Sequence, residues 1–564
     1  MAIRRTAAAT VAMATTLATL MVAPGSAIAA PDDQSIEYTV AAEDGVSAAA
    51  AVAAIEELGG TVVSRNDSVG MFEVQADTDF AARAEAAPQL VGAATQRAIG
   101  QIPDLPDAVE EEAILAGGGH GSPKRHPTGV GMDPLDDLLW GLTMVRSDRA
   151  RAREAGDRRV KVGILDSGID ASHPDLAPNL NLALSRNFAP DIPLIDGPCE
   201  VPSCLDPIGV DDNGHGTHVA GTVAAAANGL GVSGVAPKVT LVQLKGGQDS
   251  GFLFLAPVVN ALTYAADHGI DVVNMSFYVD PWLYNCVSNP ADSPEAQAEQ
   301  RTIIRVMFRA LTYAHFHGVT LVGSLGNNHE DLGHPRTDIS SPDFPPGTAY
   351  SRPIDNRTCI DLPVEGPFVI GVSALGPSTT KADYSNYGTE QISVSAPGGW
   401  FRDFFGTPEH RVNGNQILST YPKVVLQRLG RVDADGNVVA GFETLVFKDC
   451  NPAGVCGYYQ YLQGTSMASP HAVGVAALIV SRFGNKTRHG GISLEPWKVE
   501  GHLLGTAAEH ACPVPPLRSY ANEGRPAEFD ALCEGGLNFN GFYGYGIVDA
   551  YAAVTAPPAW GRRP

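Results

Sequence analysis

The chain has 564 residues and is acidic, because 38 Lys and Arg stand against 62 Asp and Glu for a formal net charge of −24. This balance argues against nucleic acid or an anionic membrane surface as a partner, since both are held by clustered positive charge. Beyond residues 1–30 no stretch stays apolar over the roughly 18 residues that a membrane span needs, so we expect no membrane contact once that segment is removed.

Residues 1–30 have the three parts of a secretory signal peptide. Arg4 and Arg5 supply the positive start, an apolar run continues to Val22, and the small residues Ala27 and Ala29 precede the expected cut. An uncleaved anchor is the alternative, but proline and two aspartates follow too soon for it. We therefore expect a secreted, extracellular mature protein.

Residues 31–102 alternate between strand and helix patterns. Strands are expected over 35–40, 61–65, 70–75 and 89–102, and alanine-rich or amphipathic helices over 46–58 and 79–87. The order strand-helix-strand-strand-helix-strand predicts a small α+β domain of the ferredoxin-like, split βαβ type. An independent domain of another use is the alternative to the role that we assign to it below.

Residues 103–134 combine acidic residues, a run of three glycines and several prolines, so they predict an exposed linker. Residues 135–564 follow without another such break, and we expect them to form one enlarged α/β domain. Two stretches rich in turn formers, 284–300 and 400–459, are expected to be surface loops inserted into it.

The first chemical motif follows a buried strand. Val160, Val162, Ile164 and Leu165 predict a parallel strand, and Asp166 with the following Ser-Gly ends it at its carboxyl end, where open α/β sheets build their sites. A turn-forming aspartate is the alternative interpretation.

The second motif places His215 between two glycines, just before an alanine-rich helix pattern. A histidine here fits a general base. It could instead cap the helix, or bind a metal together with His218, although neither a His-Glu-x-x-His pattern nor a nearby cysteine supports a metal.

The third motif places Ser466 at the start of a helix that is apolar almost all round. Unpaired backbone N–H groups and the helix dipole favour negative charge at this position, so an oxyanion forming beside Ser466 would be stabilised. An N-capping serine is the alternative.

Together, Asp166-Ser167-Gly168, His215-Gly216-Thr217-His218 and Gly464-Thr465-Ser466-Met467-Ala468 resemble the three signatures of the subtilisin-like serine proteases, in that family's order Asp, His, Ser. The resemblance implies a doubly wound, mostly parallel sheet flanked by helices. It implies a serine endopeptidase in which Asp166 orients His215, His215 is the general base and acid, and Ser466 is the nucleophile. An inactive relative that only binds proteins is the alternative function.

The family also supplies an asparagine amide that faces the oxyanion. Asn327 resembles that residue, because it follows Gly326 after the strand pattern of residues 319–323, and Asn328 is the alternative. Ser276, and the segment of Ser324, Leu325 and Gly326, match the walls of the family's primary substrate pocket, and Phe277 is expected to contact substrate beside them. Phe277 and the tyrosine after it replace a more open Leu-Gly pattern, so specificity is not predicted.

The resemblance further implies that residues 31–102 are a propeptide, an intramolecular inhibitor that the enzyme removes near the linker 103–134. Protein or peptide substrates are the other expected partners. The chemistry needs no cofactor, but structural calcium is common in the family, and Asp175 matches one of its ligands.

Eight cysteines in an exported chain predict disulfides. Spacing favours Cys199 with Cys204, Cys450 with Cys456, Cys512 with Cys533 and, by elimination, Cys286 with Cys359. The sequence alone allows on the order of 100 different pairings.

Overall fold

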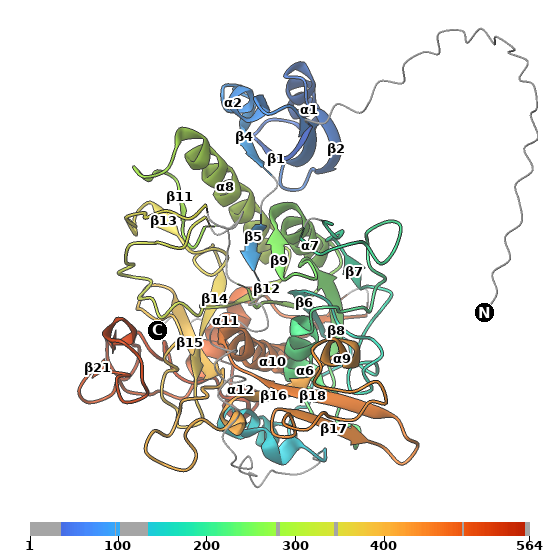
Figure 1. Cartoon of the computed structure of the whole chain (residues 1–564), viewed down its shortest axis with the longest axis vertical. Coiled ribbons are helices and arrows are strands. Elements are labelled where there is room, and N and C mark those ends of the chain that lie inside the picture. Colours follow the sequence, from blue (N-terminus) through green and yellow to red (C-terminus); the bar gives the residue numbers. More distant parts are fainter. Residues whose placement is uncertain are drawn as a thin grey trace, which may run out of the picture.

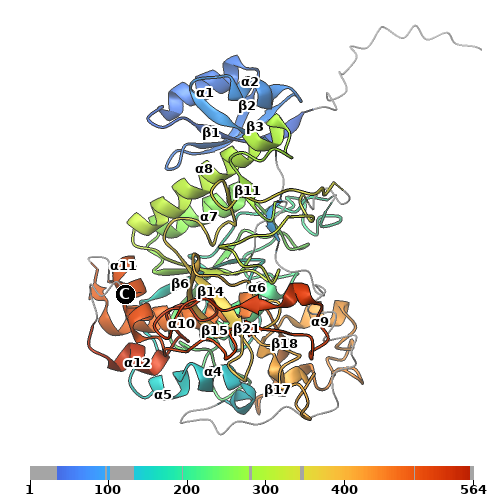
Figure 2. The same ribbon diagram turned by 90° about the vertical axis from the view of Figure 1, so that its left-hand side faces the viewer.

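A computed structural model of the chain describes residues 35–95, 98–101, 133–193, 195–277, 282–342, 348–487 and 490–558. The predicted signal peptide, and the linker up to residue 132, lie outside these residues. A small N-terminal module sits on one end of a much larger body (Figures 1 and 2). Within the described chain, no helix has both the length and the apolar character to span a membrane.

The N-terminal module is the predicted α+β domain. Four antiparallel strands lie in the order β2-β3-β1-β4 under two helices, and Tyr38, Phe72 and Phe80 lie buried in a core of their own. The helix α1 begins after Ser47, whose hydroxyl accepts a hydrogen bond from Ala50 N. The bounds are β1 Ile36–Ala42, α1 Ala48–Glu57, β2 Thr61–Asn66, β3 Met71–Ala76, α2 Phe80–Glu85 and β4 Leu90–Thr95.

The single strand predicted over residues 89–102 is wrong. Its first half is β4 of the module, whereas Ala98–Gln101 forms β5, which pairs antiparallel with β9 (Phe252–Phe254) of the large body. A run of strand-forming residues carries no signal for which sheet edge it will join, because the partner lies far away in the sequence.

The large body is built on a seven-stranded sheet in the order β15-β14-β12-β10-β6-β8-β7, and each neighbouring pair is parallel. This confirms the predicted doubly wound α/β fold. From β6 the chain runs to β7 and β8 on one side of the sheet and then crosses to β10 on the other side of β6, so β6 lies at the topological switch point. The strands are β6 Lys161–Asp166, β7 Arg186–Asn187, β8 Thr240–Lys245, β10 Val272–Met275, β12 Thr320–Ser324, β14 Val369–Leu375 and β15 Ile392–Pro397.

Helices cover both faces of this sheet, as the layers in Figure 2 show. Val162 and Ile164 of β6 pack into the core that contains α6 and α10, whereas Leu165 packs into the core that contains α7 and α8. The helix α10 is buried from Thr465 to Val480, which is why its sequence is apolar all round. The helices are α6 His215–Ala224, α7 Leu255–Asp267, α8 Pro294–Phe316, α10 Thr465–Phe483, α11 Pro496–Thr506 and α12 Ala550–Thr555.

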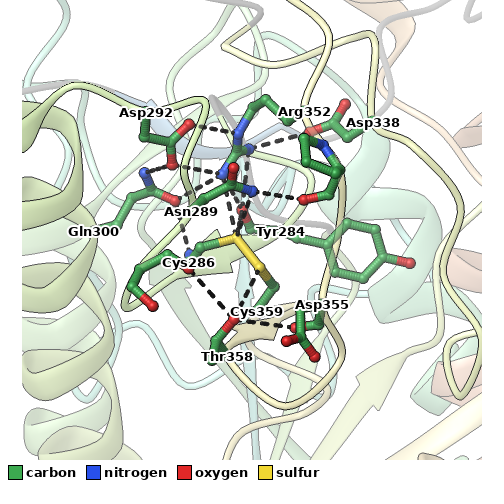
Figure 3. The surroundings of a disulfide bond; sticks show 12 residues. Tyr284, Cys286, Asn289, Asp292, Gln300, Asp338, Arg352, Asp355, Thr358 and Cys359 are labelled. Atoms are coloured by element: carbon green, nitrogen blue, oxygen red, sulfur yellow. Dashed lines mark hydrogen bonds and ion pairs between the residues drawn. A yellow bond between two sulfur atoms is a disulfide. The ribbon is translucent and has the colours of Figure 1, made fainter.

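The two predicted surface loops contain regular secondary structure, and part of each is buried. Residues 284–300 contain β11 and the start of α8, and Tyr284, Cys286 and Gln300 are buried (Figure 3). Residues 400–459 contain most of a second sheet, β16-β18-β17, whose aromatic side chains pack under α6. Turn formers mark the bends correctly, but they do not report the long-range pairing between them. The strands are β11 Asn285–Cys286, β13 Cys359–Ile360, β16 Ile417–Thr420, β17 Val446–Cys450 and β18 Cys456–Leu462, with α9 at Lys423–Arg428.

The four predicted disulfides are present: Cys199–Cys204, Cys286–Cys359, Cys450–Cys456 and Cys512–Cys533. All eight cysteines of the chain are thereby paired. The remaining short elements are α4 Trp140–Met144, α5 Ser147–Ala150, β19 Asn485–Lys486, β20 Ile492–Ser493, β21 Leu517–Arg518 and β22 Ala531–Leu532, with single 3₁₀ turns at Asp136–Leu138, Asn413–Asn415 and Ala527–Phe529.

Candidate active site

Asp166 is the last residue of the central strand β6 and is fully buried. Its Oδ1 lies 2.8 Å from Nδ1 of His215, the first residue of α6. The helix can come this close because Gly216 has no side chain, since a Cβ there would lie 2.2 Å from the carbonyl oxygen of Gly168. The strand end and the helix start therefore bring the two predicted residues together.

The ring of His215 is held at one nitrogen and free at the other. The ring is buried, and its Nε2 has no hydrogen-bond partner among the residues that the structure describes. An imidazole that donates Nδ1–H to a carboxylate keeps Nε2 as an acceptor, which is the form of a general base.

His218 does not share a site with His215. Its Nε2 lies 3.0 Å from the carbonyl oxygen of Ile417 and 3.1 Å from that of Gln460. Burial lowers its pKa from 6.5 to about 3, so this side chain is neutral and bonds to backbone. The contacts give His218 a role in fixing α6 against the second sheet.

Ser466 is the second residue of α10 and is 3% exposed. Its hydroxyl donates to the backbone oxygen of Ser276 at 3.0 Å, and the Ser276 hydroxyl donates back to the Ser466 carbonyl at 2.9 Å. The end of β10 and the start of α10 are thus joined in both directions. The predicted pocket residue Ser276 lies directly against the predicted nucleophile.

Asn327 is tied to the residue that precedes Ser466. Its side-chain oxygen accepts hydrogen bonds from the backbone N–H and from the hydroxyl of Thr465, both at 2.9 Å. Its amide nitrogen therefore remains for a further acceptor near Ser466. The alternative residue Asn328 instead donates its backbone N–H to Asn386, away from α10.

The other predicted pocket residues lie around this junction. Phe277, Ser324 and Leu325 are buried, and Gly326 has a φ of 100°, where a Cβ would lie 2.5 Å from the side chain of Asn386. Gly326 N donates to the hydroxyl of Thr465 at 3.1 Å, so this segment is also fixed to α10.

A cleft with a volume of ≈ 470 Å³ opens beside Asn327. Most of its walls were not predicted from the sequence, because they come from segments that no short motif connects. They include Tyr284, Glu330, Arg336, Ile339 and Phe529.

Asp175 accepts hydrogen bonds from Tyr459, Val232 and Asn228, which occupy both of its side-chain oxygens. Burial raises its pKa from 3.8 to about 7. Calcium at Asp175 therefore stays a prediction that these contacts do not favour.

A different group of four carboxylates was missed. Asp191, Glu200, Asp206 and Asp249 each place an oxygen within 4.8 Å of the others. The signal that could have found it is the acidic loop between Asp166 and His215, closed on itself by the pair Cys199–Cys204.

The subtilase family model, of peptidase family S8, matches residues 157–546. Subtilisin DY from Bacillus licheniformis is 28% identical over 344 residues, covering 61% of this chain and 85% of that protein. Fervidolysin from Fervidobacterium pennivorans is 28% identical over 389 residues, covering 66% of this chain and 41% of its own length.

Solved structures show the same fold. The epidermin leader peptide processing serine protease from Staphylococcus aureus superposes with a TM-score of 0.60 at 18% identity, covering 93% of this chain and 98% of that one. The crystal structure of fervidolysin superposes with a TM-score of 0.55 at 22% identity, and the match covers 93% of this chain and 62% of the fervidolysin chain.

Proposed function

The chain belongs to the subtilase family and is a serine endopeptidase, and we propose that it cleaves peptide bonds through Asp166, His215 and Ser466, with Asn327 as an oxyanion donor. The observation that carries this assignment is the buried His215 ring, with Nδ1 on the Asp166 carboxylate at 2.8 Å and Nε2 unpartnered among the described residues. Subtilases need no cofactor for this chemistry, and Asp, His and Ser supply all of its steps.

The reaction begins when the Ser466 hydroxyl turns from the Ser276 carbonyl to His215. Its oxygen attacks the carbonyl carbon of the scissile bond while its proton passes to His215 Nε2, and Asp166 stabilises the imidazolium that results. The negative oxygen of the tetrahedral intermediate accepts hydrogen bonds from the Asn327 amide and from backbone N–H at the start of α10.

The intermediate collapses as the C–N bond breaks, and His215 returns the proton to the departing amine. This leaves the acyl group esterified to Ser466. Water then attacks the ester with His215 again as the base, which releases the carboxylic acid and restores the serine.

Residues 31–102 act as the propeptide in this proposal, residues 103–134 as the linker and residues 135–564 as the catalytic domain. The pairing of β5 with β9 supports it, because an extended chain that adds to a sheet edge is how proteases hold substrate. The module is also bound to α8 by ion pairs of Arg301 with Glu85 and of Arg305 and Arg309 with Asp44.

Export completes the proposal. Four disulfides form and persist in an oxidising compartment, which agrees with a secretory signal over residues 1–30. The substrates are then proteins or peptides outside the cell.

The assignment is tested with a fluorophosphonate probe and with the precursor. The probe should modify Ser466, as read by peptide mass mapping, and the Ser466→Ala precursor should remain uncut. Ser481→Ala, at the far end of the same helix, is the matched control and should mature normally. A labelled residue other than Ser466 would refute the nucleophile. If Ser466→Ala matures at the same bond and rate, another protease does the cutting and only the self-processing proposal fails.

A further inference from the structure

A buried aspartate, Asp361, stands next to a residue that lines the cleft beside Asn327. The short strands β11 and β13 pair antiparallel, with Cys286 opposite Cys359, and the disulfide between these two cysteines fixes that register. Two residues further along the same register, Tyr284 comes opposite Asp361. Opposite residues of an antiparallel pair are close enough for their side chains to interact.

Tyr284 connects Asp361 to the cleft. Its side chain lines the cleft together with Asn327, and Figure 3 shows its ring extending away from the disulfide. The hydroxyl of Tyr284 is buried and has no hydrogen-bond partner among the described residues. Tyr284 also packs in one hydrophobic cluster with Leu325, a predicted wall of the substrate pocket. The pocket wall, the cleft and Asp361 are therefore parts of one region.

Carboxylates outnumber cations around the Tyr284 hydroxyl. The side chains whose charge raises the pKa of Tyr284, after the larger effect of burial, are four carboxylates: Asp361, Glu330, Glu365 and Asp338. Arg336 is paired with Glu330 at 2.7 Å, and Arg352 is paired with Asp338 at 3.2 Å. No cation pairs with the other two carboxyl groups among the residues that the structure describes.

Asp361 is the member of this set that no donor reaches. It is 2% exposed, and within the described chain its side chain accepts no hydrogen bond. Glu365 instead accepts from Asp361 N and, at 2.6 Å, from the Gln391 amide. Arg525 also lines the cleft, but it is paired with Asp383 at 2.5 Å. Burial and the charge of Glu365 raise the pKa of Asp361 well above 3.8, so this carboxyl holds a proton until a cation replaces it.

We propose that Asp361 selects substrates with an arginine or lysine as the acyl-side residue, the one whose carbonyl carbon Ser466 attacks. This inference rests on the proposed function of Ser466 and Asn327. The Asn327 amide faces the oxygen of that carbonyl, so the side chain of the acyl-side residue begins beside the mouth of the cleft. A long side chain that enters the cleft then reaches Tyr284 and, opposite it, Asp361.

A cationic group is what this region lacks. Its N–H groups would donate to the Asp361 carboxylate and to the Tyr284 hydroxyl, and its charge would stabilise the ionised form of the buried acid. Arginine suits the pair better than lysine, because its planar guanidinium can donate to two acceptors at once.

The chain itself offers a basic residue where we propose that processing occurs. Lys124 and Arg125 are the only lysine and arginine in the linker 103–134. A preference for a basic acyl-side residue would therefore direct self-processing to this point of the linker.

The test compares two peptide substrates that differ in charge and hardly in shape. One has arginine as the acyl-side residue, and the other has citrulline, which is uncharged. The mature enzyme should cleave the arginine peptide with a kcat/KM higher by roughly 10²-fold, because citrulline leaves the buried Asp361 without a cation.

Asp361→Asn keeps the size of the side chain and should bring the ratio of the two kcat/KM values close to one, with the citrulline peptide cleaved as by the parent. Asp361→Ser removes the same charge with a smaller side chain and should act alike, which covers a failure of the first variant to fold. Asp355→Asn, which changes an exposed carboxylate six residues earlier, is the matched control and should keep the parent's ratio.

Binding of benzamidine, a small arginine mimic, gives a readout without turnover. Calorimetry in the Ser466→Ala background should show binding that Asp361→Asn weakens by at least ~10-fold. Equal cleavage of the arginine and citrulline peptides by the parent would overturn the proposal and leave the protease function intact. A ratio that survives in the Asp361 variants would also overturn it, because another group would then select the charge. Hydrolysis of neither peptide, with no fluorophosphonate labelling of Ser466, would instead refute the proposed function.

Discussion

Two buried polar networks in this protein differ in whether all of their polar atoms have hydrogen-bond partners. Around the Cys286–Cys359 disulfide, Arg352 is fully buried, and its three nitrogens reach Asp292, Asp338, Gln300 and the Tyr284 carbonyl (Figure 3). We call this set the Arg352 network. At the active site, His215 Nε2 and Asp166 Oδ2 are equally buried but accept or donate no hydrogen bond among the described residues.

This difference distinguishes a network that stabilises the fold from a site that carries out a reaction. A charge whose partners are all within the protein is already in its lowest state and fixes the chain around it. A buried polar atom without a hydrogen-bond partner raises the free energy of the folded protein unless a ligand or a reacting group bonds to it. Such an atom therefore marks a candidate site for a ligand or a reaction. The carboxylate of Asp191 is similar to the active site in this respect, because both of its buried oxygens lack a hydrogen-bond partner among the described residues.

The largest effect is expected from removing a catalytic side chain of the active site. Ser466→Ala and His215→Ala should each lower kcat by on the order of 10⁶-fold, the size known for subtilisin, and the double variant should lose no more, because the two residues act as a unit. Steady-state rates on a peptide substrate measure this. His334→Ala, which changes an exposed histidine, is the control and should stay active. Losses that multiply in the double variant would contradict the assignment.

Breaking the Arg352 network should affect folding instead of chemistry. Arg352→Leu leaves Asp292 and Asp338 buried without a cation and should lower the free energy of unfolding by about 3–5 kcal/mol. Arg357→Leu breaks a solvent-exposed ion pair with Asp355, which should leave the free energy of unfolding nearly unchanged. Urea titration in the Ser466→Ala background compares them. Equal losses in the two variants would show that burial is not what makes the network important.

A smaller effect is expected at the oxyanion donor. Asn327→Ala should lower kcat by roughly 10²–10³-fold with little change in KM, as found for the corresponding donor of subtilisin, because the charge that it meets forms in the transition state. Asn328→Ala is the neighbouring control and should keep most of the rate. If the two variants exchange their effects, the donor is Asn328 and the geometry around Thr465 has been misread.

The smallest effect is expected from two neighbouring carboxyl groups, the buried Asp361 and the half-buried Glu365, which form no ion pair with an arginine among the described residues. Burial raises the pKa of Glu365 from 4.5 to about 7, and burial and Glu365 raise that of Asp361 well above 3.8. The folded protein then holds protons that the unfolded chain has lost, so stability falls as pH rises from about 4.5 to 7, by on the order of 1–3 kcal/mol.

Glu365→Gln should flatten this fall, as measured by thermal midpoints across that pH range in the Ser466→Ala background. Glu509→Gln, which changes an exposed carboxylate elsewhere on the large body, is the control and should keep the parent's slope. A slope that Glu365→Gln leaves unchanged would assign the pH dependence to other buried carboxyl groups.

Short patterns in the sequence were sufficient for the parts of the protein that are locally encoded. The buried strand before Asp166, the glycines around His215 and the apolar helix after Ser466 each lie within about a dozen residues, so propensity and periodicity predict the element and where it begins or ends. The α+β order of the N-terminal module follows in the same way.

Only the tertiary structure decided which distant segments meet. The partner of β5, the Arg352 network, the contact that favours Asn327 over Asn328 and the grouping of Asp191 with Asp249 all join residues from separate loops and strands. Such contacts form because the sheet brings strand ends to one edge, and no local propensity reports them. The sequence could therefore identify the candidate reacting groups. Whether their oxygens and nitrogens have hydrogen-bond partners depends on packing between distant segments of the chain.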